Sequence, residues 1–168
     1  NNREIHTAYR RQRQKCIRES TRTKVVVSHV TTKVLNNDIG YIAISDFEGE
    51  CASEFETKYK QLEKQGIKKL IIDIRNNGGG IVDEALKIAN MLVDKDSTLL
   101  ITKDKSDKEE VTKATEKPII NIPTVVLVNE YSASASEILA GALKDNGKAI
   151  LVGTKTHGKG IIQELHQL

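Results

Sequence analysis

The stretch KKLIIDIRNNGGGIVDEALKIANMLVD, residues 68–94, shows how this chain is organised. Its first seven residues are mostly apolar, which is typical of a strand buried on both faces of a sheet. Two asparagines and three glycines follow. Apolar residues then recur on one side of a helix, at Val82, Leu86, Ala89 and Val93. A buried strand, a loop and an amphipathic helix form the repeating unit of a layered α/β domain.

The same alternation continues on both sides of this stretch. Strands are predicted at 39–45, 97–103, 124–130, 148–153 and 161–168, and helices at 52–65 and within 131–147. The other segments are an extended one at 24–35, a turn at 36–38 and a charged hairpin or loop at 104–117. This order predicts an α/β domain with a largely parallel core sheet. In such sheets the loops beyond the carboxyl ends of the strands carry the chemistry, which selects residues 75–80, 129–136 and 153–160.

The composition is that of a soluble globular protein. With 168 residues, 38% of them hydrophobic and 29% charged, the chain supports one domain, with or without an arm. No run approaches the roughly 20 apolar residues of a membrane-spanning helix. Cys16 and Cys51 fit neither a metal-binding spacing nor a disulfide framework, and they can pair only if the fold brings them together. We therefore expect no metal site.

The charge is unevenly distributed. Residues 1–25 carry eight basic and two acidic side chains, a net +6, so the remainder of this +3 chain is −3. A basic arm can bind nucleic acid or an anionic membrane. We favour a solvated connector instead, because Tyr9 is the only aromatic residue among those charges and nucleic-acid binding usually needs stacking side chains.

The loop GTKTHGKG, residues 153–160, raises the question of nucleotide binding. Gly153, Gly158 and Lys159 have the spacing of a phosphate-binding loop. That motif needs Ser or Thr after the lysine to hold magnesium, and a helix whose amino end faces the phosphates. Here Gly160 follows the lysine, and only Ile161, Ile162 and six further residues come after it. We therefore expect no nucleotide cofactor.

The loop YSASASE, residues 131–137, joins a strand to a helix. Ser134 and Glu137 have the spacing of a capping box, and Ser132 and Ser136 can be solvated hydroxyls. A serine at a strand-to-helix turn is also the usual seat of a nucleophile. The loop RNNGGG, residues 75–80, is equally consistent with a tight turn and with a site whose backbone amides bind an oxyanion.

A serine nucleophile needs a base. His157 with Asp145 could complete a conventional triad, but Lys159 is the preferred candidate. A lysine accepts a proton only when desolvation lowers its pKa, and the flanking glycines with Ile161 and Ile162 could provide such surroundings. On a strand, Gln163 would project from the same face as the lysine and could hold its amine without adding charge.

Three motifs together, DIRNNGGG, LVNEYSASASEIL and GTKTHGKGIIQ, resemble in order and spacing those of the C-terminal processing peptidases, a family of Ser–Lys endopeptidases. The resemblance covers about residues 38–163. It implies that Ser134 is the nucleophile, Lys159 the general base and Gln163 the residue that orients it. It also implies an oxyanion hole formed by the amides of Gly80 and Ala135, and a Clp-protease or crotonase-like core of stacked ββα units.

The resemblance further implies a serine endopeptidase that cleaves protein substrates near their C-terminal tails, without metal or cofactor. It implies an extracytoplasmic location, and it allows a homodimer and peripheral membrane attachment. Residues 1–35 are interpreted as a basic arm and linker at the junction with a PDZ domain, and residues 36–168 as a C-terminally truncated catalytic core. The chain departs from the family at His157, where phenylalanine is common. A non-catalytic peptide-binding relative and an acyl-CoA enzyme of the same fold remain as alternatives.

Overall fold

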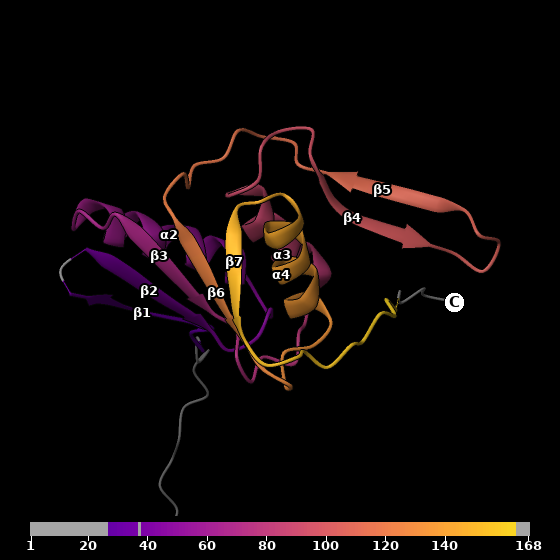
Figure 1. Ribbon diagram of the computed structural model, residues 1–168, viewed down its shortest axis with the longest axis horizontal. Helices are drawn as coiled ribbons and strands as arrows, with labels where there is room; N and C mark the ends of the chain where they lie inside the picture. Colours follow the sequence, from indigo (N-terminus) through magenta and orange to yellow (C-terminus); the bar gives the residue numbers. More distant parts are fainter. Residues whose placement is uncertain (1–26, 37, 164–168) are drawn as a thin grey trace, which may run out of the picture.

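The computed structural model describes residues 27–36 and 38–163. Figure 1 shows a twisted sheet, helices packed beside it and a hairpin that projects from the body. The elements in chain order are β1 (Val30–Leu35), β2 (Ile39–Ile44), α2 (Cys51–Lys64), β3 (Lys69–Asp73), α3 (Val82–Asn90), β4 (Thr98–Lys103), β5 (Glu109–Lys113), β6 (Thr124–Val128), α4 (Ala135–Asp145) and β7 (Ala149–Gly153).

The main sheet has the strand order β1-β2-β3-β6-β7. β1 and β2 are antiparallel, whereas β2, β3, β6 and β7 are parallel neighbours. The prediction of an α/β fold with a largely parallel sheet is confirmed. Because β3, β6 and β7 are parallel, the loops that follow them leave the sheet at the same edge.

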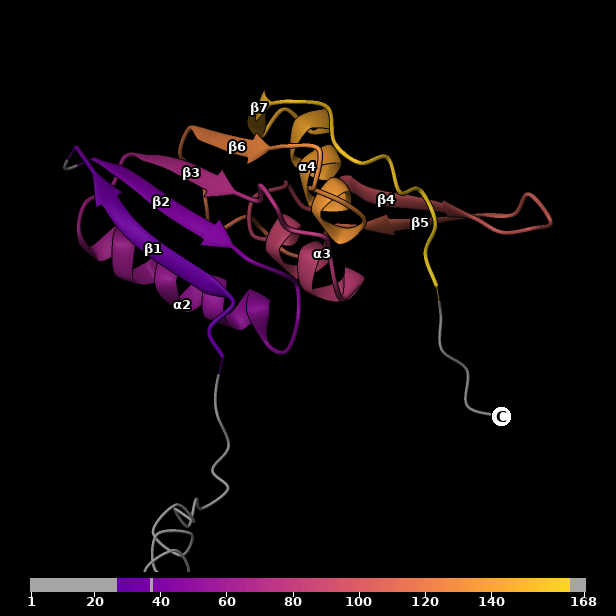
Figure 2. The same ribbon diagram turned by 90° about the horizontal axis from the view of Figure 1, so that it is seen from below.

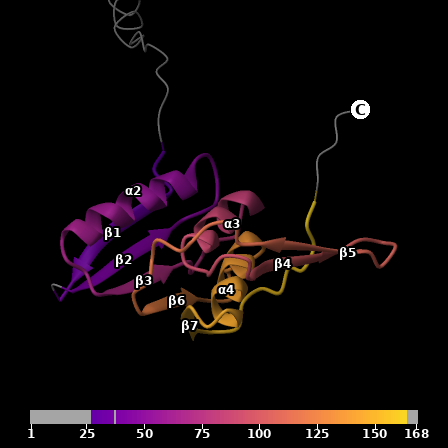
Figure 3. The same ribbon diagram turned by 90° about the horizontal axis from the view of Figure 1, so that it is seen from above.

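The helices cover one face of the sheet. Figures 2 and 3, which view the molecule from opposite sides, both show α2, α3 and α4 on the same side of the strands. Ile42, Ile72 and Val126 are fully buried within this layer. The alternating residues point to the other face, where Ile150 on β7 is 69% exposed and Ile71 on β3 is only partly buried. The expectation that β3 is buried on both faces was therefore wrong, because no second helical layer is present among the described residues.

β4 confirms the strand predicted at 97–103, but it does not join the main sheet. It pairs antiparallel with β5, which lies inside the charged segment 104–117, so that segment is the predicted hairpin. The register breaks between Thr98 and Leu100, and the hairpin extends away from the helices (Figures 1 and 3).

Two further expectations concern the ends of the chain. Residues 161–163 form no strand, contrary to the prediction for 161–168, and the last five residues lie outside the described part. The basic arm and Cys16 lie outside it as well.

Cys51 is buried, and burial together with nearby carboxylates, Glu84 foremost, raises the pKa of its thiol to about 12. None of the helices in the described part of the chain is long and apolar enough to cross a membrane.

Candidate active site

The three loops selected from the sequence meet beside the amino end of α4. A Cβ atom on Gly79 would lie 2.9 Å from the Ser134 Cβ, so the glycine loop packs directly against the serine. A Cβ on Gly80 would lie 2.7 Å from the Phe47 carbonyl oxygen, and both glycines have positive φ. Only glycine fits these two positions. Gly78 has open space around it, so close approach accounts for two of the three glycines.

Asn77 holds the shape of the glycine loop. Its side chain is fully buried, donates to the Ile44 carbonyl oxygen at 3.0 Å and accepts the Gly79 N–H at 2.8 Å. Its backbone carbonyl accepts the Ser136 hydroxyl at 2.9 Å. A buried amide with these partners fixes the loop relative to both β2 and α4.

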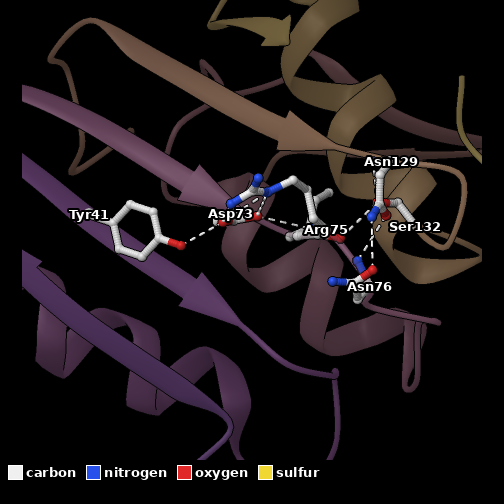
Figure 4. A network of polar contacts seen from close by, with 7 residues as sticks. Tyr41, Asp73, Arg75, Asn76, Asn129 and Ser132 are labelled. Atoms are coloured by element: carbon white, nitrogen blue, oxygen red, sulfur yellow. Dashed lines mark hydrogen bonds and ion pairs between the residues drawn. The ribbon is translucent and has the colours of Figure 1, made fainter. Parts of the chain in front are cut away.

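A second polar network begins at the end of β3 (Figure 4). Arg75 donates to both carboxylate oxygens of Asp73, with its Nε 2.9 Å from Oδ1 and an Nη 2.6 Å from Oδ2. The Tyr41 hydroxyl donates to the same carboxylate at 2.5 Å. Burial alone would raise the pKa of Asp73, but the hydrogen bonds from Arg75 and Tyr41 outweigh it and lower the pKa. Asp73 is therefore ionised at neutral pH and ties the first residue of the loop to the sheet.

The other half of Figure 4 joins the loops after β3 and β6. Asn76 and Asn129 form a reciprocal pair: the Asn76 N–H donates to the Asn129 Oδ1 at 2.9 Å, and the Asn129 Nδ2 donates to the Asn76 Oδ1 at 2.8 Å. Ser132 is fully buried and donates to the Ile74 carbonyl oxygen at 2.7 Å. The Ser132 hydroxyl thus links the two loops.

Ser134 differs from the serines on either side of it. Ser132 and Ser136 are fully buried and bonded to backbone carbonyls, whereas Ser134 is half-buried at the N-cap of α4. Its backbone has φ 55° and ψ −118°, a conformation that costs a non-glycine residue of order 1–3 kcal/mol. A strained serine at the turn from a strand into a helix is the geometry of an exposed nucleophile.

Two backbone amides beside Ser134 have no acceptor. The N–H groups of Gly80 and Ala135 donate to none of the other described residues, whereas those of Gly79 and Ser134 donate to Asn77 and Glu137. Free N–H groups at a helix amino end attract negative charge. Within the described part of the chain, the site therefore offers two unpaired donors, one on the glycine loop and one at the first residue of α4.

Glu137 joins the serine to the lysine loop. Its carboxylate accepts the Ser134 N–H at 2.9 Å, which is the Glu137 half of the predicted capping box. The same carboxylate accepts the N–H groups of Gly158 at 2.7 Å and Lys159 at 2.9 Å. Burial would raise the pKa of Glu137, but hydrogen bonds from the Thr156 hydroxyl and these amides prevail and lower it.

We expect Glu137→Gln to lower kcat/KM by about 10- to 100-fold, because an amide nitrogen would face backbone N–H donors and displace the lysine loop. The pKa of Glu137 is lowered in the folded protein. The stabilisation that its ionised carboxylate gives to the folded site is therefore fully present above its ordinary pKa, near 4.5, and is lost as the pH falls through the lowered folded value. The wild type should therefore lose activity in that acid range, because protonated Glu137 no longer holds the lysine loop. Kinetics as a function of pH, with thermal unfolding in parallel, measure this.

Glu130→Gln is the matched control. Glu130 accepts the Thr154 hydroxyl at 2.9 Å from the same loop, but it makes no hydrogen bond to Ser134 or Lys159. The control should keep wild-type kcat/KM. Equal kinetics for the wild type and Glu137→Gln over the acid range would contradict this role of Glu137.

Lys159 shares a pocket with Ser134. The pocket has a volume of about 650 Å³ and lies between α4, β4 and the glycines at 158 and 160. Lys159 is exposed, and so are Ile161 at 70% and Ile162 at 41%. The expected apolar surroundings of the lysine are therefore absent here, because residues 161–163 extend away from the body instead of forming a strand. Gln163 is exposed and lies outside the lining of the pocket.

The conventional triad is excluded by the geometry. Asp145 ends α4 and Ser134 precedes its first residue, so the two lie about 16 Å apart along the helix. His157 is exposed, and its backbone N–H donates to the Ser132 carbonyl oxygen at 3.0 Å. Within the described residues no cluster of three or more His, Cys, Asp or Glu side chains could hold a metal ion.

Two residues that organise the site were not predicted to do so. Asn77 was interpreted as part of a turn, although an asparagine between a buried strand and glycines is a signal for a side chain that caps loop amides. Glu137 was assigned only to the helix cap. Its contact with the lysine loop could not be found from spacing alone, because it spans 21 and 22 residues.

Residues 38–168 match the model of peptidase family S41. The chain belongs to this family. A carboxyl-terminal-processing protease of Picosynechococcus is 44% identical over 77% of the chain and 31% of its own length. Carboxyl-terminal-processing peptidase 3 of Arabidopsis thaliana, described as chloroplastic, is 42% identical over 90% of the chain and 30% of its own length. The chain thus spans less than a third of these S41 relatives.

Solved structures agree with the family assignment. A photosystem II D1 C-terminal processing protease superposes with a TM-score of 0.74 and 37% identity, over 86% of this chain and 41% of that one. A peptidase structure from Parabacteroides merdae superposes with a TM-score of 0.69 at 21% identity, which supports the fold alone. The mixed α/β core with its mostly parallel sheet is the S41 peptidase fold.

Proposed function

We propose that this chain is the catalytic core of a serine endopeptidase that cleaves protein substrates near their C-terminal tails through a dyad of Ser134 and Lys159. The observation that carries the proposal is the strained, half-buried Ser134 at the start of α4, beside two unpaired amides and in one pocket with Lys159. The names of the S41 relatives support the substrate class.

In the proposed cycle the Lys159 amine takes the proton from the Ser134 hydroxyl as its oxygen attacks the peptide carbonyl. The N–H groups of Gly80 and Ala135 stabilise the oxyanion that forms. The C–N bond then breaks as the lysine gives its proton to the departing amine. A water molecule, deprotonated by the same lysine, hydrolyses the ester on Ser134. Gln163 is proposed to orient the lysine once the segment after residue 160 is positioned.

Covalent labelling tests the proposal directly. A small fluorophosphonate should add one label per chain, and peptide mass spectrometry should place it on Ser134. The reason is that a serine is phosphonylated rapidly only when a base and an oxyanion site activate it. Denatured protein serves as the control. Labelling on Ser132 or Ser136 instead, or none above the denatured control, would contradict the assignment.

A non-catalytic peptide-binding module is the second candidate, and it would fail to label while still binding peptide. Finer features of the proposal follow the resemblance alone. We infer an extracytoplasmic location, a division into a basic arm and a catalytic core, and a whole protein able to form a homodimer or attach to a membrane surface. The core includes β1, because residues 30–35 pair with β2 in the main sheet, so the boundary expected between residues 35 and 36 lies too late in the chain.

A further inference from the structure

The pocket beside Ser134 is a groove with three walls. α4 forms one wall along most of its length, β4 forms the second, and the glycines on either side of Lys159 form the third. Figure 1 shows β4 and the chain after β7 on the same side of α4. At the end far from Ser134, the Asn146 side chain donates to the Thr98 carbonyl oxygen at 2.9 Å and joins α4 to β4. The groove is therefore bridged at one end and contains the serine at the other.

One edge of strand β4 borders the groove. Four consecutive residues, 98–101, line the pocket. Side chains alternate between the two faces of a strand, so a run of four can border one space only along the strand edge. One edge of β4 pairs with β5, and no strand of the described residues pairs with the other. Unpaired backbone groups at a strand edge are a template for adding an extended chain.

The α4 wall is apolar with a gap at its centre, and Glu137 and Asp145 line it towards its two ends. Ile138 and Ala142 line it, and Gly141 lies between them. A Cβ on Gly141 would meet no atom within 4 Å, so the space above this glycine is open. Glycine weakens the interior of a helix and packing does not require it here, so its effect at this position is to leave room in the groove.

We propose that this groove binds an extended segment of the substrate, whose backbone pairs with the free edge of β4 and whose apolar side chain at about the third residue from the cleaved bond lies over Gly141. The inference rests on the proposed function, because it takes Ser134 as the reacting group. From Ser134 to Asn146 the groove is about 18 Å long, which accommodates about five extended residues. Gly141 thus determines how large the apolar side chain can be.

Binding to a Ser134→Ala protein tests the inference without depending on catalysis. The probes are two fluorescent hexapeptides with blocked ends, identical except for leucine or alanine at the third residue from the bond cleaved by the wild type, or at a central position if nothing is cleaved. Adding Gly141→Leu should weaken binding of the leucine peptide at least tenfold, since pocket differences of one methylene already change selectivity about 10- to 200-fold. The alanine peptide should lose less. Thermal stability should not fall, because leucine favours the helix over glycine.

Lys144→Leu is the matched control, because it adds the same side chain to α4 at an exposed position outside the groove. It should leave both peptides unaffected. Unchanged binding of the leucine peptide to the Gly141→Leu protein, or equal losses for both peptides, would overturn the inference. Failure of the fluorophosphonate to label Ser134 in the wild type would instead overturn the proposed function, and the binding comparison would still decide the groove.

A backbone scan tests the pairing with β4. N-methylation of the leucine peptide, one position at a time, should weaken binding at alternate positions only, because alternate N–H groups of a paired strand face its neighbour. Equal sensitivity at successive positions, or none, would overturn the β4 part of the inference.

Discussion

Replacing Ser134 with alanine is expected to abolish proteolysis, lowering kcat/KM by about 10⁴-fold or more, while the protein stays folded. The reason is that Ser134 alone among the three neighbouring serines is free of a buried structural bond and lies in the pocket with Lys159. The assay uses the natural protein that contains this chain as the enzyme and an unfolded protein as the substrate. Mass spectrometry of the cleavage products measures the loss of activity. Circular dichroism and the melting temperature report folding.

The neighbouring serines provide the controls. Ser132→Ala and Ser136→Ala remove hydroxyls that bond the Ile74 and Asn77 carbonyls, so each should destabilise the fold by about 1–3 kcal/mol and leave the nucleophile in place. Ser134→Gly should be inactive, yet about 1 kcal/mol more stable than Ser134→Ala, because glycine relieves the positive φ. Residual cleavage by Ser134→Ala, with contamination excluded, would show that the nucleophile lies elsewhere.

The sequence was sufficient to predict the parts of the fold that depend on local pattern. Apolar runs and helical periodicity located β3, α3 and α4, and the parallel order of the sheet followed from their alternation. The pattern could not show that β4 leaves the main sheet, because a strand of the same composition fits either place. It also could not show that only one face of the sheet carries helices, since apolar runs alone do not distinguish one covered face from two.

The candidate site likewise contains features that the local sequence pattern predicts and features that it does not. Ser134 and the glycine loop were found because their chemistry depends on local backbone geometry: a strand-to-helix turn and a close approach of two backbones. Their mutual contact followed from the rule that loops at one edge of a parallel sheet meet. The contacts of Asn77 and Glu137 join residues far apart in the chain, and no spacing rule predicts them. The position of the Lys159 side chain depends on residues 160–163, which are exposed here.

The exposure of Lys159 defines what its proposed role as a base requires. A lysine accepts a proton near neutral pH only when it is removed from water. Its backbone is already held, because Glu137 accepts the Lys159 N–H, and its side chain borders the groove proposed for the substrate. A bound peptide would cover the amine and exclude water from it. The proposed role of Lys159 as a base therefore requires that the bound peptide cover its side chain.

Lys159→Arg is expected to be as inactive as Lys159→Ala, with kcat/KM lowered by about 10²- to 10⁴-fold in both, because a guanidinium stays charged and cannot take the serine proton. Lys155→Arg, an exposed lysine of the same loop outside the pocket lining, is the control and should keep full activity. If Lys159 served only to bind an anion, the arginine variant would retain most of the activity, and that result would rule out the dyad.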